Sequence, residues 1–135
     1  MSAKVWMTNL AVYRSGLEAQ LSFILHRVTG LGILAFLLVH VLDTSTVFFF
    51  PSHYEHAIGI YQTVPFMISE IFLVFSVIYH GVNGARIAII DLYLVKKWEI
   101  RSQLNSALWT FFIAVLLWLP AAFIMGRNVL EKLGI

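Results

Sequence analysis

The sequence predicts an all-α integral membrane protein in which three helices cross the bilayer. Of its 135 residues, 60% are hydrophobic and 12% are charged, which is far from the composition of soluble globular domains. Three stretches are apolar over the roughly 20 residues that a helix needs to cross a membrane. A chain of this length forms one domain, residues 1–135, and leaves no room for a soluble catalytic domain beside the helices.

The three predicted spans follow a mixed amino-terminal stretch. Residues 1–20 combine aromatic, apolar and basic side chains, which favours a short interfacial segment against the lipid headgroups. The spans are then expected at about residues 21–50, 66–90 and 104–125.

Two prolines and the segments beside them mark the expected ends and bends. Pro51 is expected to end the first span, and residues 51–65 are expected to form a loop. Pro120 is expected to kink the third span, and residues 126–135 are expected to form a short tail.

The basic residues predict how the chain is oriented. Seven of the nine lie in the amino-terminal region, at the end of the second span or in the loop after it: Lys4, Arg14, Arg27, Arg86, Lys96, Lys97 and Arg101. Because cytoplasmic segments are enriched in lysine and arginine, we expect a multi-pass protein of the cytoplasmic membrane with its amino terminus inside and its carboxyl terminus outside. The net charge of +2 therefore indicates topology and not a nucleic-acid surface.

The second span carries polar residues that an ordinary membrane helix lacks. His80, Gly84 and Asp91 fall on one face at helical spacing. A buried histidine needs a partner, because an unpaired polar group in lipid costs several kcal/mol. A haem would use the imidazole as an iron ligand and the flat face at Gly84 as room for its ring. Alternatively, the histidine bonds a neighbouring helix and the glycine allows close packing. Cysteine is absent from the sequence, which excludes cysteine-ligated iron–sulfur or zinc sites within this chain.

The first span begins with a second polar group. Ser22 and His26 share one face, and Arg27 is adjacent at the headgroup boundary. A hydroxyl and a guanidinium can hydrogen-bond the carbonyl oxygens of a quinone, and the guanidinium can equally hold a haem propionate. Structural alternatives are that Arg27 reaches lipid phosphate, that Ser22 caps the helix and that His26 sits in the wet interface. The spacing by itself leaves these alternatives open.

Polar residues near the other end of the first two spans are harder to interpret. His40 lies about 21 Å along the helix from His26 at 1.5 Å per residue. It can ligate a second haem, or it can donate a structural hydrogen bond to a neighbour such as Asp43, which we favour. Glu70 on the second span can pair with His40 or with a partner chain, or belong to a proton route.

Two stretches in these spans resemble a known family. SFILHRVTG and HGVNGARIAIID resemble the two signatures of the cytochrome b membrane-anchor subunit of succinate dehydrogenase, the larger of its two small anchor chains. The first signature is matched by Ser22, His26, Arg27 and Thr29, and the second by His80, Gly84, Arg86 and Asp91. The order of the signatures, the three spans and the expected orientation agree with this family over nearly the whole chain.

The resemblance implies a function as part of succinate:quinone oxidoreductase. The bundle would be completed by a partner anchor subunit and would dock the iron–sulfur and flavoprotein subunits, so this chain would not contact succinate. One haem b would be shared with the partner anchor, and His80 would be an axial ligand of its iron. Ser22 and Arg27 would line the site where quinone is reduced. His26 and Arg27 would approach the haem propionates, with Gly84 and Arg86 in the haem vicinity.

The chain departs from the family pattern at two places. The residue after the signature arginine is Ile87, where many members have a histidine that contacts a propionate, and a proline-bearing motif upstream of the first signature is missing. One haem is expected, and a second one at His40 is the lesser alternative. Rival functions from other classes are a small proton or solute channel with a polar vestibule, or a structural anchor without cofactor.

Overall fold

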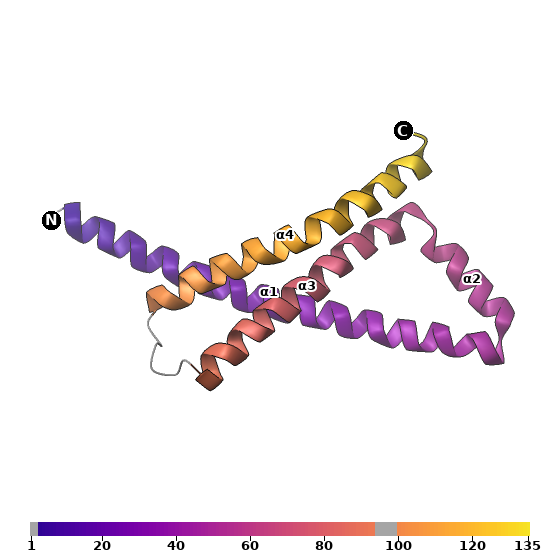
Figure 1. The fold of residues 1–135 in the computed structure, drawn as a ribbon, viewed down its shortest axis with the longest axis horizontal. Coiled ribbons are helices and arrows are strands. Elements are labelled where there is room, and N and C mark those ends of the chain that lie inside the picture. The colour runs from indigo at the N-terminus through magenta and orange to yellow at the C-terminus, as the bar shows by residue number, and fades with distance from the viewer. Residues whose placement is uncertain (1–2, 94–99) are drawn as a thin grey trace.

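A computed structural model gives the fold of the chain. It describes the backbone of residues 3–93 and 100–135, and the side chains of residues 20–93 and 105–135. The helices are α1 (Ala3–Phe49), α2 (Pro51–Tyr61), α3 (Val64–Tyr93) and α4 (Ile100–Leu133) (Figure 1). Helices account for nearly all of this described backbone, and it contains no strand. The prediction of an all-α fold is therefore confirmed.

Three of these helices are long and apolar enough to cross a membrane. Their candidate spans are Gln20–Phe49 in α1, Val64–Tyr93 in α3 and Asn105–Leu133 in α4. The prediction of three spanning helices is thus confirmed. The two ends of the chain lie at opposite ends of the molecule, since the three long helices run back and forth between them (Figure 1).

The connection between the first two spans is helical, so the expectation of a loop over residues 51–65 was wrong. Pro51 ends α1 as expected but also begins α2, which continues to Tyr61. Proline suits the first turn of a helix, because its missing N–H would have no partner there and its fixed φ angle is already helical. Only a short turn separates α2 from Val64, where α3 begins.

Two further expectations about the long helices need correction. Residues 3–20 do not form a separate interfacial segment, because their backbone continues into the first span as part of α1. Residues 126–133 do not form a separate short tail, since α4 runs through Pro120 and ends at Leu133. Each segment extends an existing helix, which costs less than starting a new one because nucleation is the unfavourable step.

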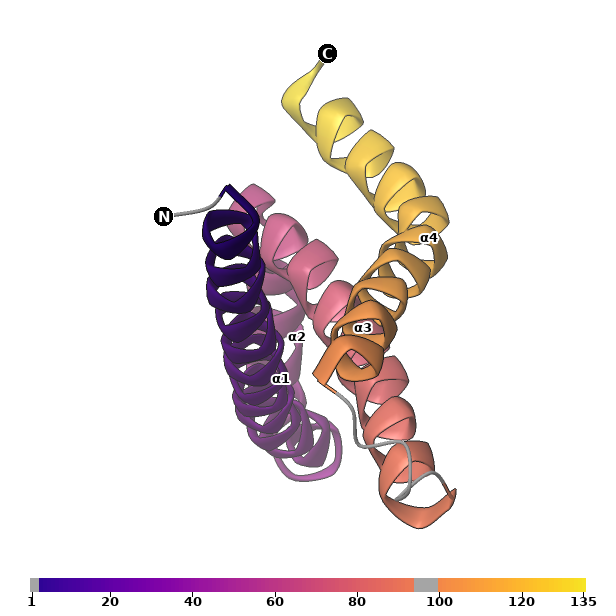
Figure 2. The ribbon, with the colours of Figure 1, turned by 90° about the vertical axis from the view of Figure 1, so that its left-hand side faces the viewer.

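α3 packs against both α1 and α4, and its contact with α4 is the more extensive one (Figure 2). Aromatic rings join α3 to α4: Phe75 meets Trp118 edge-on with centroids 5.5 Å apart. The Trp118 indole Nε1–H donates to the Ile71 carbonyl oxygen at 3.0 Å. Because lipid is as apolar as leucine, such packing and interhelical hydrogen bonds hold membrane helices together.

A tyrosine at the end of α2 connects this short helix to α1. The Tyr61 hydroxyl donates to the Asp43 carboxylate, and its ring meets Phe66 edge-on at 5.6 Å. The hydrogen bond to Asp43 is the main cause that raises the pKa of Tyr61 to about 12, with burial and the negative charges of Asp43 and Glu70 adding to it. Asp43 therefore holds the end of α2 through a protonated phenol.

Tyr61→Phe should weaken this connection in a pH-dependent manner. The ring packing stays and the hydrogen bond is lost, at a cost of about 1 kcal/mol. Since the folded pKa is raised, this stabilisation is complete below pH about 10 and disappears as the pH rises through about 12. Thermal unfolding of both proteins in detergent, followed by circular dichroism from neutral to alkaline pH, measures the difference. A difference of the same size at both extremes would contradict the role of the phenol proton.

Candidate functional site at the crossing of α1 and α3

Two histidines meet where α1 crosses α3. The imidazole rings of His26 and His80 are stacked, with centroids 4.0 Å apart and an angle of 4° between their planes. Both side chains are half-buried within their candidate membrane spans. The structure thus brings together one histidine from each of the two signature stretches.

A glycine lies one helical turn after each histidine, and the ring of the other histidine packs against it. Gly30 follows His26 and faces His80, and Gly84 follows His80 and faces His26. A Cβ added to Gly30 would lie 2.8 Å from Cε1 of His80, closer than side chains pack. A Cβ on Gly84 would lie 3.7 Å from Cε1 of His26, which is ordinary van der Waals contact. The flat face at Gly84 is therefore covered by the His26 imidazole, and Gly30 is the residue that makes room for His80.

The hydrogen bonds of the two imidazoles differ. His80 Nδ1 lies 3.1 Å from the backbone carbonyl oxygen of His26. A carbonyl oxygen only accepts, so Nδ1 carries the proton and donates, which leaves the lone pair of Nε2 available for a metal. His26 Nδ1 is buried and has no hydrogen-bond partner among the described residues. Such an atom costs about 1–3 kcal/mol unless a group from outside the chain satisfies it.

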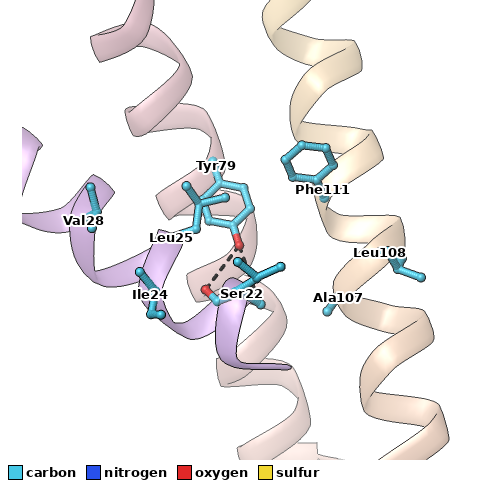
Figure 3. Close-up of a pocket in the computed structure, with 9 residues that line it drawn as sticks. Ser22, Ile24, Leu25, Val28, Tyr79, Ala107, Leu108 and Phe111 are labelled. Atoms are coloured by element: carbon cyan, nitrogen blue, oxygen red, sulfur yellow. Dashed lines mark hydrogen bonds between the residues drawn. The ribbon is translucent and has the colours of Figure 1, made fainter. Parts of the chain in front are cut away.

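An apolar cavity of about 420 Å³ lies between α1, α3 and α4, and its wall includes Leu25 and Tyr79, the residues that precede His26 and His80 (Figure 3). Its polar groups are the hydroxyls of Ser22 and Tyr79, which point toward each other across the helix interface. The remaining lining residues are apolar: Leu21, Ile24, Leu25, Val28, Ala107, Leu108 and Phe111. A mostly apolar cavity with a few polar groups is typical of sites for small amphiphilic molecules.

Tyr79 is one residue of this site that the sequence did not single out. It is 2% exposed, and its hydroxyl lies 3.3 Å from Ser22 Oγ. Tyr79 lies one residue before His80 on α3, and Ser22 lies one helical turn before His26 on α1. The contact between the two hydroxyls is therefore next to the contact between the two imidazoles, and both join α1 to α3. The signal that could have found Tyr79 is a tyrosine next to a histidine inside an apolar span.

The two arginines predicted for the site point elsewhere. Arg27 is exposed, and its guanidinium carbon lies 4.4 Å from the centroid of the Phe23 ring on its own helix. Arg86 binds α3 to α4: its Nε–H donates to Ser106 Oγ at 2.9 Å and its Nη1–H to the buried Asn83 side chain at 3.1 Å. Neither is among the residues that line the cavity.

The other candidate residues lie apart from the histidine pair. His40 is exposed, and its ring stacks on Phe36 with centroids 5.4 Å apart. Asp43, its suggested partner, instead accepts the hydrogen bond of Tyr61. In the part of the chain that is described, the His40 ring has no hydrogen bond. Asp91 is exposed near the end of α3, and Glu70 lies near Tyr61 at the opposite end.

Comparison with known sequences identifies the family of this site. The sequence model of the succinate dehydrogenase/fumarate reductase transmembrane subunit matches residues 6–121, which include both histidines and the whole cavity wall. The chain belongs to this family. It is also similar to the succinate dehydrogenase 2 membrane subunit SdhC of Mycobacterium tuberculosis, with 32% identity over 111 residues, or 82% of this chain and 79% of that protein.

Membership makes the chain a membrane anchor subunit of a succinate dehydrogenase, which is an oxidoreductase complex. The resemblance inferred from the two signatures is therefore confirmed. Within the described residues, no group of three or more histidine, aspartate or glutamate side chains could hold a bare metal ion. A haem iron needs fewer protein ligands, because the porphyrin supplies four nitrogens.

Gly30→Ala tests whether the helix crossing depends on the space at Gly30. The added methyl group would collide with the His80 ring at 2.8 Å, so the ring must move and the anchor should lose stability by about 1–3 kcal/mol. Gly32→Ala is the matched control, because its Cβ meets nothing within 4 Å and alanine favours a helix. Thermal unfolding in detergent compares them. Equal stability of the two variants would show that the close approach of His80 to Gly30 is unimportant.

Proposed function

We propose that this anchor subunit ligates haem b through His80 and forms part of the site where the complex reduces quinone. The observation that carries the proposal is the arrangement at the α1–α3 crossing. There, His80, with a lone pair available on Nε2, directly follows Tyr79, which lines an apolar cavity whose wall also contains a serine hydroxyl. Both features involve residues of the two signature stretches.

Three features of the crossing fit a haem. The His26 carbonyl accepts from Nδ1 of His80, which is the arrangement that orients a metal-binding histidine and raises its basicity. Gly30 and Gly84 leave space that the imidazoles of His80 and His26 occupy, so both rings are held at the crossing. His26 Nδ1 is a buried nitrogen that a polar group of the haem or of a partner subunit would satisfy. A haem bound by His80 supplies a one-electron redox centre inside the membrane.

The cavity fits the ring of a quinone. Its volume of about 420 Å³ and its apolar wall suit a flat ring with a hydrophobic tail. The Ser22 hydroxyl can donate to a carbonyl oxygen of that ring, and this bond strengthens as the oxygen gains negative charge on reduction. Arg27, one residue past His26, is exposed and can contribute from the rim after turning away from Phe23.

The remaining parts of the complex follow from the family. Electrons would come from succinate through a flavoprotein subunit and an iron–sulfur subunit docked on the anchor, and a partner anchor subunit would supply the second iron ligand. The distribution of basic residues supports an orientation with the amino terminus in the cytoplasm and the carboxyl terminus outside the cytoplasmic membrane. Most large apolar side chains of the spans are exposed in the single chain, which leaves surface for lipid and for a partner anchor.

His80→Ala should remove most of the haem b absorbance from the purified complex, because the iron loses one axial ligand. His40→Ala is the control, since its ring stacks only on Phe36 and one haem per flavin is expected. The Soret band per flavin measures both. A full Soret band in His80→Ala would refute ligation by this residue, and a ratio near two that falls to one in His40→Ala would establish the second haem.

Ser22→Ala should slow electron transfer from succinate to a short-chain quinone by about 10-fold. This is the effect expected when the quinone carbonyl oxygen, which gains negative charge on reduction, loses one hydrogen bond. Arg27→Ala should impair this transfer more weakly. Succinate oxidation with a soluble artificial acceptor should be unchanged, because the flavin lies on another subunit. Ser45→Ala is the matched control, since Ser45 is exposed and bonds only its own helix. Equal loss in both assays would indicate a role in assembly.

A further inference from the structure

Ser22 makes a different hydrogen bond from Ser45, Ser69 and Ser76 of the membrane helices. The hydroxyls of Ser45, Ser69 and Ser76 each donate to a carbonyl oxygen three or four residues back on their own helix. This is the usual bond of a helical serine, since it satisfies the hydroxyl without another residue. The Ser22 hydroxyl instead meets Tyr79 of α3 at 3.3 Å, so its direction depends on a second helix.

The Tyr79 side chain is packed tightly enough to fix the direction of the Ser22 hydroxyl. Its ring stacks on Phe75 with centroids 5.9 Å apart and meets Phe111 of α4 edge-on at 6.3 Å. The residue is 2% exposed, so its hydroxyl needs a partner within the protein. That partner is Ser22, through Oγ at 3.3 Å and the backbone carbonyl oxygen at 3.4 Å.

Either hydroxyl of the pair can be the donor. The phenol has one proton, and its shorter contact is the one to Ser22 Oγ, at 3.3 Å against 3.4 Å to the Ser22 backbone carbonyl oxygen. When the phenol donates to Oγ, the serine proton is not used within the pair and is available to a molecule in the cavity, whose wall both residues form (Figure 3).

We propose that Tyr79 is a positioning residue that holds the Ser22 hydroxyl toward the cavity, where it donates to a carbonyl oxygen of the quinone ring. This inference rests on the proposed quinone site and adds the residue that prepares its hydrogen-bond donor. Without the phenol, Ser22 would turn to its own helix as Ser45, Ser69 and Ser76 do, and the cavity would lose its preorganised donor. Binding of the ring would weaken while the electron-transfer groups stayed intact.

Tyr79→Phe in the purified complex tests this role, because it removes the hydroxyl and keeps the ring packing against Phe75 and Phe111. Succinate-dependent reduction of a short-chain benzoquinone and of a short-chain naphthoquinone is measured over a range of concentrations. The quinone KM should rise about 3- to 10-fold, as for loss of one hydrogen bond, with kcat within about twofold. Tyr61→Phe is the matched control, since it loses a tyrosine hydrogen bond at the other end of the bundle.

A double-mutant cycle separates positioning from an independent contact. If Tyr79 acts through Ser22, adding Tyr79→Phe to Ser22→Ala should change KM no further. Additive effects would show that Tyr79 contacts the quinone by itself and would overturn the positioning role. KM does not depend on the amount of enzyme, so a lower yield of the variant complex leaves the measurement valid. The Soret band, recorded in parallel, should be unchanged and would reveal damage to the neighbouring His80.

The outcomes distinguish this inference from the function on which it rests. A raised KM in Ser22→Ala with an unchanged KM in Tyr79→Phe would overturn the role of Tyr79 and leave the quinone site in place. Unchanged quinone kinetics in both variants would refute the quinone site itself. A fall in kcat at constant KM in Tyr79→Phe would show that the phenol serves only structure.

Discussion

The constraint on which this structure depends is that a polar group inside a membrane must find its partner within the protein. The bilayer core supplies no water, so an unpaired donor or acceptor costs more there than at a soluble surface. Each polar contact between the long helices meets this constraint. Tyr79 bonds Ser22, His80 bonds the His26 carbonyl, and the Trp118 indole bonds the Ile71 carbonyl. These bonds fix which faces of α1, α3 and α4 meet.

The same constraint explains why the candidate site lies at the α1–α3 crossing. Most of the described surface of the long helices is apolar and exposed, so it cannot specify one arrangement by itself. The crossing combines two half-buried imidazoles with two glycines that let the helices approach. One buried atom there, His26 Nδ1, is left without a hydrogen-bond partner among the described residues, which supports the proposal that a group from outside the chain binds at the crossing.

Arg86 shows that a signature residue can serve structure. Its guanidinium is half-buried and donates to Ser106 of α4 and to Asn83, which is 1% exposed. A charge in a membrane span needs such partners, and these lie on the side of α3 that faces α4. The contact keeps α4 against α3 and so maintains the third wall of the cavity, to which Ala107, Leu108 and Phe111 belong.

The sequence by itself determined the all-α class, the three spans and the family, because apolar runs of membrane length and the spacing of signature residues are local properties. It also singled out His26 and His80, since ionisable residues are rare inside spans. The pairing of their rings, the need for glycine at Gly30 and the contact of Tyr79 with Ser22 were decided by tertiary structure. Each joins residues 50 or more positions apart, and no local pattern encodes which faces of two helices meet. Likewise, the helix over Pro51–Tyr61 was missed because its polar sequence resembles a loop until Tyr61 is seen to bond Asp43.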